Sequence, residues 1–240
     1  MKQLIFSLMA FFSIAAFAQE NKTIADPSAV KRDLAGGFTA ISVSDGIDLY
    51  LSQGSSESVS VSASDEKYLE NYRTELDKGT LKIFYDKKTL GISLNGKKKL
   101  KAYVSFKTLQ KLTVTGGADV LATTDIEADH LEMKFTSGAH FNGKVTAKEL
   151  SIEQTSGSGV IITGKAVKIK VECSSGAVFK GYGFEADNCD AKATSGGGVH
   201  ITVNNELTAR ANSGGGIRYR GKGMIKDISI SSGGIVKKEN

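Results

Sequence analysis

A run of lysines is the feature of this chain best suited to binding chemistry. Eight lysines and no acidic residue occur between positions 87 and 111, and four of them cluster at Lys97, Lys98, Lys99 and Lys101. Such a cluster fits an anionic ligand such as an acidic polysaccharide. The alternative is a solvated strand face whose lysines discourage edge pairing. The lysines lack the aromatic interleaving typical of single-strand binding, so we predict no nucleic-acid partner.

Residues that could perform catalysis or bind a metal are scattered. The histidines His130, His140 and His200 fall at different positions of the repeat described below, with no acidic or cysteine cluster beside them. Protein metal sites need several ligands that converge at about 2 Å, so we predict no metal site. The aspartates and glutamates also occupy different registers, and no paired general acid and base stands out. We therefore predict no catalytic residue, no cofactor and no enzymatic activity.

A phrase of three small residues recurs seven times in the second half of the chain. Its third residue is always glycine, and successive glycines are 21, 19, 19, 20, 18 and 19 residues apart. A period this regular indicates stacked structural repeats. The copies are Thr115-Gly116-Gly117, Thr136-Ser137-Gly138, Thr155-Ser156-Gly157, Ser174-Ser175-Gly176, Thr194-Ser195-Gly196, Asn212-Ser213-Gly214 and Ser231-Ser232-Gly233.

Apolar residues flank each copy in the pattern of β-strands. The positions five before and three after the glycine are apolar in all seven copies, and the position three before it is apolar except at Gln154. This alternation predicts a strand, a tight turn at the phrase, and a second short strand. One unit buries too little apolar surface to fold alone, but units stacked about 4.8 Å apart bury a continuous core. The sequence therefore predicts an all-β parallel β-helix, a solenoid with rungs of about 19 residues.

The Ser, Thr and Asn side chains two residues before each glycine should form a ladder along the turn edge. One interpretation is structural, with these side chains hydrogen-bonded between rungs. The alternative is a flat hydroxyl-bearing face that recognises an ordered lattice such as ice or a glycan. The ladder lies at a corner beside glycines and not in mid-strand, which favours the structural interpretation.

The start of the chain has the features of a secretory signal peptide over residues 1–18. Lys2 precedes an apolar run that is too short to span a membrane, and an Ala-Phe-Ala cleavage site follows before Gln19. A polar leader covers residues 19–36. Residues 37–240 form a single predicted β-helix domain, irregular over 37–111 and regular over 112–240. Asp65 begins a short predicted helical turn in the irregular part.

The two cysteines, Cys173 and Cys189, should be buried free thiols. They occupy core positions of neighbouring rungs that are offset by about four residues, or roughly 13 Å along the strand. Disulfide geometry requires Cα atoms within about 7 Å, so we predict no bridge.

The opening of the domain resembles a known family. Residues 38–54, FTAISVSDGIDLYLSQG, look like the start of the head GIN domain family of autotransporter-adhesin heads, and residues 77–83, DKGTLKI, are similar to its second block. The Ser-Gly rungs match its glycine-rich tail, so the resemblance covers nearly all of residues 37–236. The name-giving Gly-Ile-Asn appears here as Gly46-Ile47-Asp48. The resemblance implies a right-handed β-helix in an exported protein of the Bacteroidetes type, and it transfers no ligand-binding residue.

The C-terminal end offers a further surface. The last rung is incomplete, since the phrase and its following strand end four residues before Asn240. Lys237-Lys238-Glu239 fit the charged residues that blunt an open β edge. The alternative is an edge through which copies of the chain assemble end to end.

Three functional classes follow from these features. We predict a non-enzymatic, exported, adhesin-like binding module that recognises a glycan or another anionic envelope or matrix polymer through an elongated side face. The first alternative is a periplasmic or envelope structural protein that self-assembles as a homo-oligomer through its rung ends. The second is a polysaccharide-active β-helix enzyme. The mild net charge of +5 favours anionic partners slightly. We predict no membrane span and a location in the periplasm or at the cell surface.

Overall fold

The computed structural model describes residues 26–86 and 98–240. The predicted signal peptide, the first part of the leader and Lys97 lie outside these residues. The described strands are β1 (Val30–Arg32), β2 (Ala40–Val43), β3 (Asp48–Gln53), β4 (Ser58–Ser62), β5 (Tyr72–Asp77), β6 (Thr80–Tyr85), β7 (Lys101–Phe106), β8 (Lys111–Val114), β9 (Asp119–Ala122), β10 (Ile126–Phe135), β11 (His140–Gln154), β12 (Gly159–Cys173), β13 (Val178–Ala193), β14 (Gly198–Ala211), β15 (Gly216–Arg220), β16 (Met224–Ile230) and β17 (Ile235–Lys238).

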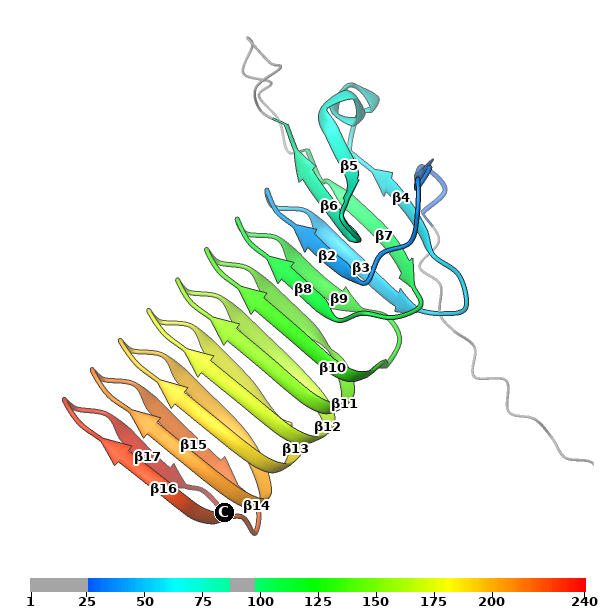
Figure 1. Cartoon of the computed structure of the whole chain (residues 1–240). Helices are drawn as coiled ribbons and strands as arrows, with labels where there is room; N and C mark the ends of the chain where they lie inside the picture. The colour runs from blue at the N-terminus through cyan, green and yellow to red at the C-terminus, as the bar shows by residue number, and fades with distance from the viewer. Residues whose placement is uncertain (1–25, 87–97) are drawn as a thin grey trace, which may run out of the picture.

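The predicted solenoid is confirmed. Strands β10 to β14 pair in parallel in chain order, and β15, β16 and β17 continue the stack. Leu131 pairs with Leu150, which pairs with Ile169, so successive rungs are 19 residues apart (150 − 131 and 169 − 150). Figure 1 shows the rungs as a stack whose tight turns all lie at one edge.

Each tight turn reverses the chain in two residues. In the second copy Ser137 has φ 57° and Gly138 has φ 73°, and the Ala139 amide donates to the Thr136 carbonyl at 3.3 Å. Two successive left-handed residues define a type I′ turn, for which glycine is suited and serine is strained. The Gly138 amide also donates to the carbonyl of Ser156 in the next rung at 3.0 Å, so the turns are bonded to one another through backbone.

The strand pattern within a rung differs from the expectation of two short strands. β11 is a single strand of 15 residues that leaves one turn and runs unbroken to the next. Its alternation of buried and exposed residues breaks at Lys148 and Glu149, both of which are exposed. The strand bends there. One continuous strand therefore forms both sides of the rung and stays paired with β10 and β12 before and after the bend.

The N-terminal part joins the stack out of chain order. β2 lies between β6 and β8, and β3 lies between β7 and β9, all in parallel. The turn between β2 and β3 has the conformation of the other turns, with Asp45 at φ 63° and Gly46 at φ 68°. The Gly46 amide donates to the Gly116 carbonyl at 2.9 Å. Ser44-Asp45-Gly46 is therefore a further copy of the repeated phrase.

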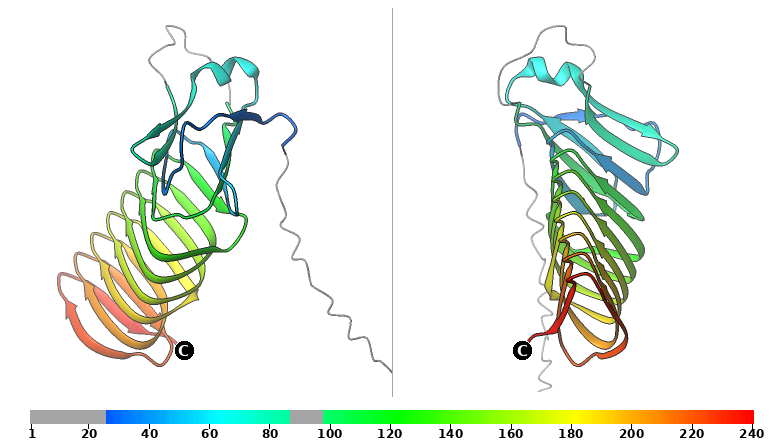
Figure 2. Two further views of the ribbon diagram at one scale, coloured as in Figure 1. Left: turned by 45° about the vertical axis from the view of Figure 1, so that its right-hand side comes forward. Right: turned by 90° about the vertical axis from the view of Figure 1, so that its left-hand side faces the viewer.

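An antiparallel cap covers the N-terminal end of the stack (Figure 2). β4 pairs antiparallel with β7 and β1, and β5 pairs antiparallel with β6. The predicted helical turn is a 3-10 helix, η1 (Glu66–Asn71), and the Asp65 carboxylate accepts the Lys67 amide as its N-cap. Strand β5 was not predicted.

The core fills the space between the two sides of each rung with aliphatic and aromatic residues. Gln154, the polar exception in the repeat, is buried and donates to the Val178 carbonyl at 3.1 Å. Cys173 and Cys189 are buried free thiols as predicted, because Cys173 pairs with Ala193 while Cys189 pairs with Ile169. Burial raises the pKa of the Cys173 thiol to about 12. No helix among the described residues is long and apolar enough to cross a membrane.

The space inside the turns narrows toward the C-terminal end. The residue after the turn glycine is a buried alanine at positions 118, 139 and 177, but it is glycine at positions 197, 215 and 234. A Cβ atom at Gly215 would lie 2.2 Å from the Ala193 carbonyl oxygen. At the next residue, Gly216, a Cβ atom would meet nothing within 4 Å.

We therefore predict opposite outcomes for two neighbouring substitutions. Gly215→Ala should lower the free energy of unfolding by about 1–3 kcal/mol, because the added methyl group overlaps backbone. Gly216→Ala should change it by less than about 0.5 kcal/mol. Denaturant unfolding of both variants beside the wild type measures this difference, and equal stabilities would contradict the described packing of the turns.

Candidate functional site

The outward side chains form two long surfaces separated by the turns. We call the surface formed by the strand segments that follow each turn the first face, and the surface formed by the segments that precede each turn the second face. The first face comprises the outward residues of β7, β3, β9, the first halves of β11 to β14, β15 and β17. Because the strands are in register, equivalent side chains lie in rows that cross the rungs.

Two adjacent rows run along the N-terminal half of the first face. The carboxylate row consists of Lys101, Asp48, Asp119, His140, Gly159 and Val178, each paired in register with the next. The aromatic row beside it consists of Tyr103, Tyr50, Leu121, Asn142, Ile161 and Lys180. An open groove of about 590 Å³ lies along both rows, from Asp48 and Tyr50 to Val178 and Lys180.

Gly159 makes the lowest point of the groove. It stands between His140 and Val178 in its row and has no side chain of its own. A Cβ atom there would lie 2.8 Å from Cδ2 of His140, so the imidazole leans into the space above the glycine. Gly198 stands in the same row, three strands from His140. A Cβ atom added there would have room, because the nearest atoms are the methyl carbons of Val178 at 3.8 Å.

Tyrosine rings form the aromatic end of the groove. Tyr50 stacks on Tyr103 with ring centroids 5.1 Å apart and an angle of 11° between the ring planes. The Tyr103 hydroxyl donates to Asp26 at 2.9 Å, which ties the leader to the stack. Burial raises the pKa of Tyr103 to about 12, and the bond to Asp26 adds to this rise. Tyr103 therefore supports Tyr50, whose ring lines the groove.

Carboxylates and an imidazole line the polar side of the groove. Nδ1 of His140 lies 3.1 Å from Oδ1 of Asp119. Burial raises the pKa of the Asp48 carboxyl above its ordinary value, the charge of Asp119 raises it further, and Lys101 opposes both effects. The groove thus combines an aromatic ring, apolar side chains and several hydrogen-bonding groups at one surface.

The predicted lysine patch does not converge in the residues that the structure describes. Nζ of Lys98 lies 4.3 Å from the ring centroid of Tyr85 in the cap. Lys99 is exposed in a left-handed conformation with φ 43°. Lys101 begins β7 and joins the carboxylate row beside Asp48. Lys97 lies outside the described residues, so an anionic ligand at this cluster stays a prediction.

The histidines are distributed over both faces. His130 lies on the second face, 3.1 Å from Glu149, while His140 and His200 lie on the first face. In the described part of the chain no three His, Cys, Asp or Glu residues are grouped so that they could hold a metal ion.

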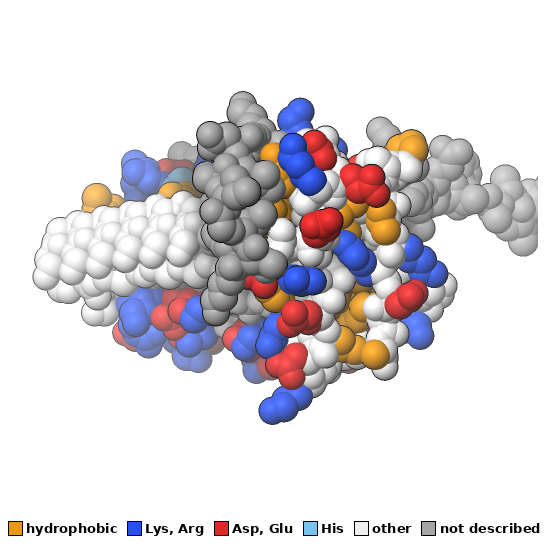
Figure 3. Space-filling view, turned by 90° about the horizontal axis from the view of Figure 1, so that it is seen from above, with side chains coloured by type: hydrophobic (Ala, Val, Ile, Leu, Met, Phe, Trp, Pro, Cys, Tyr) orange, Lys and Arg blue, Asp and Glu red, His pale blue; other side chains and the backbone are white. Residues whose placement is uncertain are grey.

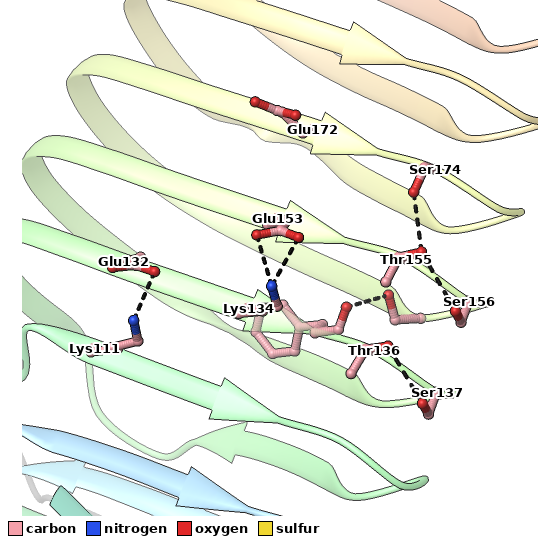
Figure 4. Close-up of polar contacts among 12 residues, drawn as sticks. Lys111, Glu132, Lys134, Thr136, Ser137, Glu153, Thr155, Ser156, Glu172 and Ser174 are labelled. Atoms are coloured by element: carbon pink, nitrogen blue, oxygen red, sulfur yellow. Dashed lines mark hydrogen bonds and ion pairs between the residues drawn. The ribbon is translucent and has the colours of Figure 1, made fainter.

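Opposite charges of neighbouring rungs form ion pairs at many positions of the second face, although Glu153 is followed in register by Glu172 and Lys192 by Arg210. Lys111 contacts Glu132 at 3.0 Å and Lys134 contacts Glu153 at 3.0 Å, as Figure 4 shows. Further along the stack Arg210 contacts Asp190 at 2.9 Å. These side chains are about half exposed, and such pairs contribute only about 0–1 kcal/mol each. A depression of about 1080 Å³ crosses this face, and its lining includes Glu132 and Asp190 of these pairs and the further pair of Lys226 with Glu206.

The turn edge is held mainly by backbone hydrogen bonds. The Ser174 hydroxyl donates to Thr155 Oγ1 of the preceding rung at 3.1 Å, whereas Thr136 contacts Ser137 of its own turn at 3.4 Å (Figure 4). In Figure 3 the edge that projects to the left, where Figure 1 places the turns, is free of charged side chains and is flanked by charges of both signs.

Sequence reasoning missed the groove because its residues are far apart in the chain. A signal for it was nevertheless present. Counted from Gly46 of the Ser44-Asp45-Gly46 turn, Asp48 and Tyr50 stand at the positions that Asp119 and Leu121 occupy after Gly117. Aligning this turn with the seven later copies would have placed all four residues side by side.

Comparisons with known proteins identify a family and a shared fold. The family model described as "Putative auto-transporter adhesin, head GIN domain" matches residues 37–223. A crystal structure of a "putative adhesin" from Bacteroides fragilis NCTC 9343 is similar, with a TM-score of 0.80 and 17% identity over 89% of this chain and 98% of that chain. No match was found among curated proteins.

Two structures from Parabacteroides distasonis ATCC 8503 are also similar, each at 18% identity. One is a "putative adhesin" with a TM-score of 0.68, covering 88% of this chain and 96% of that chain. The other is a "Putative lipid binding protein" with a TM-score of 0.66, covering 90% of this chain and 98% of that chain. At these identities the similarity establishes the fold.

The electrostatics of the groove give a prediction for Asp48. Its carboxyl should titrate above its ordinary pKa, and in Asp119→Asn its pKa should fall because the neighbouring negative charge is removed. Asp129→Asn, which removes an exposed carboxylate on another surface, should leave it unchanged. Carbon-detected NMR titration of the carboxyl groups measures the Asp48 pKa in the wild type, in Asp119→Asn and in Asp129→Asn.

The sign of the linked stability effect follows. A carboxyl with a raised folded-state pKa holds its proton more tightly in the folded state, so its contribution to stability falls as the pH rises from the unfolded-state pKa through the folded-state pKa. An Asp48 pKa that is identical in wild type and Asp119→Asn would contradict the close placement of the two carboxylates.

Proposed function

This chain belongs to the family described as "Putative auto-transporter adhesin, head GIN domain", and on that premise we propose that it is a non-enzymatic, exported, adhesin-like module that binds glycan through the groove of the first face. Export rests on the signal-peptide features of residues 1–18, and a mature protein that begins at Gln19 would support it. The observation that carries the proposal is the juxtaposition of the Tyr50 ring with Asp119, His140 and Asn142 along one open groove.

The chemistry of these groups suits a carbohydrate. An aromatic ring packs against the apolar face of a sugar, because it offers a large rigid surface with little entropy to lose. Carboxylate, amide and imidazole groups then hydrogen-bond the hydroxyls that surround the ring. Leu121 and Ile161 are exposed to 38% and 48% in the aromatic row and extend the apolar strip. An open groove on a rigid stack also admits a long polymer, whereas a deep pocket would admit only its end.

A matched pair of glycine substitutions tests the groove. Gly159→Val should fill its lowest point and weaken binding by at least about tenfold. Gly198→Val, at the same row position outside the groove, should change the affinity by less than about twofold. Valine occupies this row at Val178, so both variants should fold. The measurement is a glycan-array screen of the wild type followed by calorimetric titration of the best ligand, with melting temperatures recorded in parallel.

Two results would overturn the proposal. Equal loss of binding in both variants, or none in either, would place the ligand elsewhere. Sustained cleavage of a bound oligosaccharide, abolished by Asp48→Asn or Asp119→Asn, would replace the binding module with an enzyme, since paired carboxylates are the groups that glycosidases use.

Self-assembly is the second candidate function, because the last described rung exposes its apolar residues. Ile228 and Ile230 continue the buried columns of Ala209 and Ala211, yet they are 44% and 50% exposed. Another copy of this chain, stacked against β16, would cover them and pair the strand edge.

Light scattering over a range of concentrations tests assembly. If this edge joins copies, the wild type should show a mass above that of one chain, and Ile228→Lys with Ile230→Lys should restore the monomer. A wild type that stays monomeric throughout would remove this candidate.

A further inference from the structure

A row of cations crosses the C-terminal half of the first face. Lys180 of β13 pairs in register with His200 of β14, His200 with Arg218 of β15, and Arg218 with Lys237 of β17. We call these four residues the basic row. Lys180, Arg218 and Lys237 are exposed and His200 is partly buried. Because the strands are parallel and in register, successive members stand about 4.8 Å apart along the solenoid.

Such a row opposes the stability of the stack. Like charges on neighbouring strands repel. On the second face the like-charged neighbours Glu153 with Glu172 and Lys192 with Arg210 are offset by ion pairs to side chains of opposite charge, such as Lys134 with Glu153 and Arg210 with Asp190. The pKa of His200 reflects the charges around it. Burial lowers this pKa and the charge of Arg218 lowers it further. Glu239 raises it, and Lys180 lowers it. A row of like charges that persists on such a molecule points to a partner of opposite charge.

Glu239 shows which chemical group the row holds. Its Oε1 accepts from Nη1 of Arg218 at 2.9 Å, and its Oε2 accepts from the Tyr182 hydroxyl at 2.5 Å. Nη2 of Arg220 lies 4.0 Å from the same Oε2. Two guanidinium groups and a phenol thus converge on one carboxylate at one end of the row. This cluster is a built carboxylate site, with the protein's own Glu239 in it.

A β-bulge shapes this site. The register between β12 and β13 shifts after Ile161 and Lys180, so that Thr163 pairs with Gly183 and β13 gains one residue at Gly181-Tyr182. Bulges redirect side chains at functional sites. Tyr182 stacks on His200 with centroids 5.1 Å apart, and the Arg220 guanidinium lies 4.2 Å from the Tyr182 ring. The ring is thus engaged by protein groups rather than presented as a platform for a nucleobase.

We infer that the basic row binds a linear acidic polysaccharide that lies along the solenoid axis, with the carboxylates that face the protein contacting cations of the row. This site shares Lys180 with the C-terminal end of the groove, but its other three residues lie outside the groove and its ligand is charged. It stands whether or not the groove binds glycan, and weak contacts repeated along a rigid row add up to useful affinity.

Binding of polygalacturonate, with neutral dextran as the uncharged control, tests the inference. Lys180→Gln with Arg218→Gln should weaken binding by at least about tenfold, because two of the four contacts are lost. Lys165→Gln with Arg210→Gln makes the same change of net charge on other surfaces and should alter affinity by less than about twofold. All these substitutions are at exposed positions, and circular dichroism checks that the wild type and the two double variants share one fold.

A substitution that should strengthen binding completes the test. Glu239→Gln removes the internal carboxylate from Arg218 and should tighten binding of polygalacturonate by about twofold or more. Raising the salt concentration should weaken binding of the wild type more than that of the Lys180→Gln, Arg218→Gln variant.

Three results would overturn the inference. Equal effects of the two double variants would mean that net charge, not the basic row, governs binding. Tighter binding of single-stranded DNA, or of vesicles containing anionic lipid, with the same dependence on Lys180 and Arg218 would assign the row to a different partner. No binding of polygalacturonate at low salt would remove the site.

Discussion

The two-residue left-handed turn at one edge of the stack is the constraint on which the rest of this structure depends. Serine in a left-handed conformation is strained by about 1–2 kcal/mol, and it recurs with φ between 47° and 57° from Ser137 to Ser232. The strain persists because each turn is bonded to its neighbours: the glycine amide of one turn donates to the serine carbonyl of the next. A turn of fixed length also fixes register. The side chains two and four residues beyond every glycine therefore fall into rows, and both the groove and the basic row are consequences of that register.

The two faces share this register but use it differently. On the second face, many charged side chains form ion pairs with a side chain of opposite charge on a neighbouring rung, as with Lys111 and Glu132, and these pairs attract the rungs to one another. On the first face, residues of one kind gather. Tyrosines, carboxylates and a glycine notch form the groove toward the N-terminal end, and cations follow toward the C-terminal end. A solenoid gives every row the same geometry, so the chemical contrast between rows distinguishes a recognition surface from a structural one.

The stack of rungs could be predicted from the sequence. The pairing of strands that are distant in the chain could not, because it depends on contacts that local sequence patterns do not specify. The period of the turn phrase predicts the stack because each copy has the same backbone requirement. The position of β2 and β3 was not predictable from chain order, since they insert between β6 and β8 and between β7 and β9.

The lysine cluster shows that residues close together in the sequence can separate in the structure. Lys98 and Lys101 are close in sequence, but Lys98 lies over the ring of Tyr85 whereas Lys101 pairs in register with Asp48 on the first face. Members of the basic row are 18 to 20 residues apart in the sequence. They can be recognised as neighbours only after the chain is aligned by its repeat.

The central claim is that the first face is the recognition surface, and chemical-shift mapping tests it most directly. The isotope-labelled protein would be titrated with neutral oligosaccharides, and the backbone and tyrosine-ring signals would be followed. The account predicts perturbations confined to first-face residues of β3, β9, β11 and β12, with the Tyr50 ring among the largest. Perturbations confined to the second face or to the turn edge would contradict it, as would a spectrum that no glycan changes.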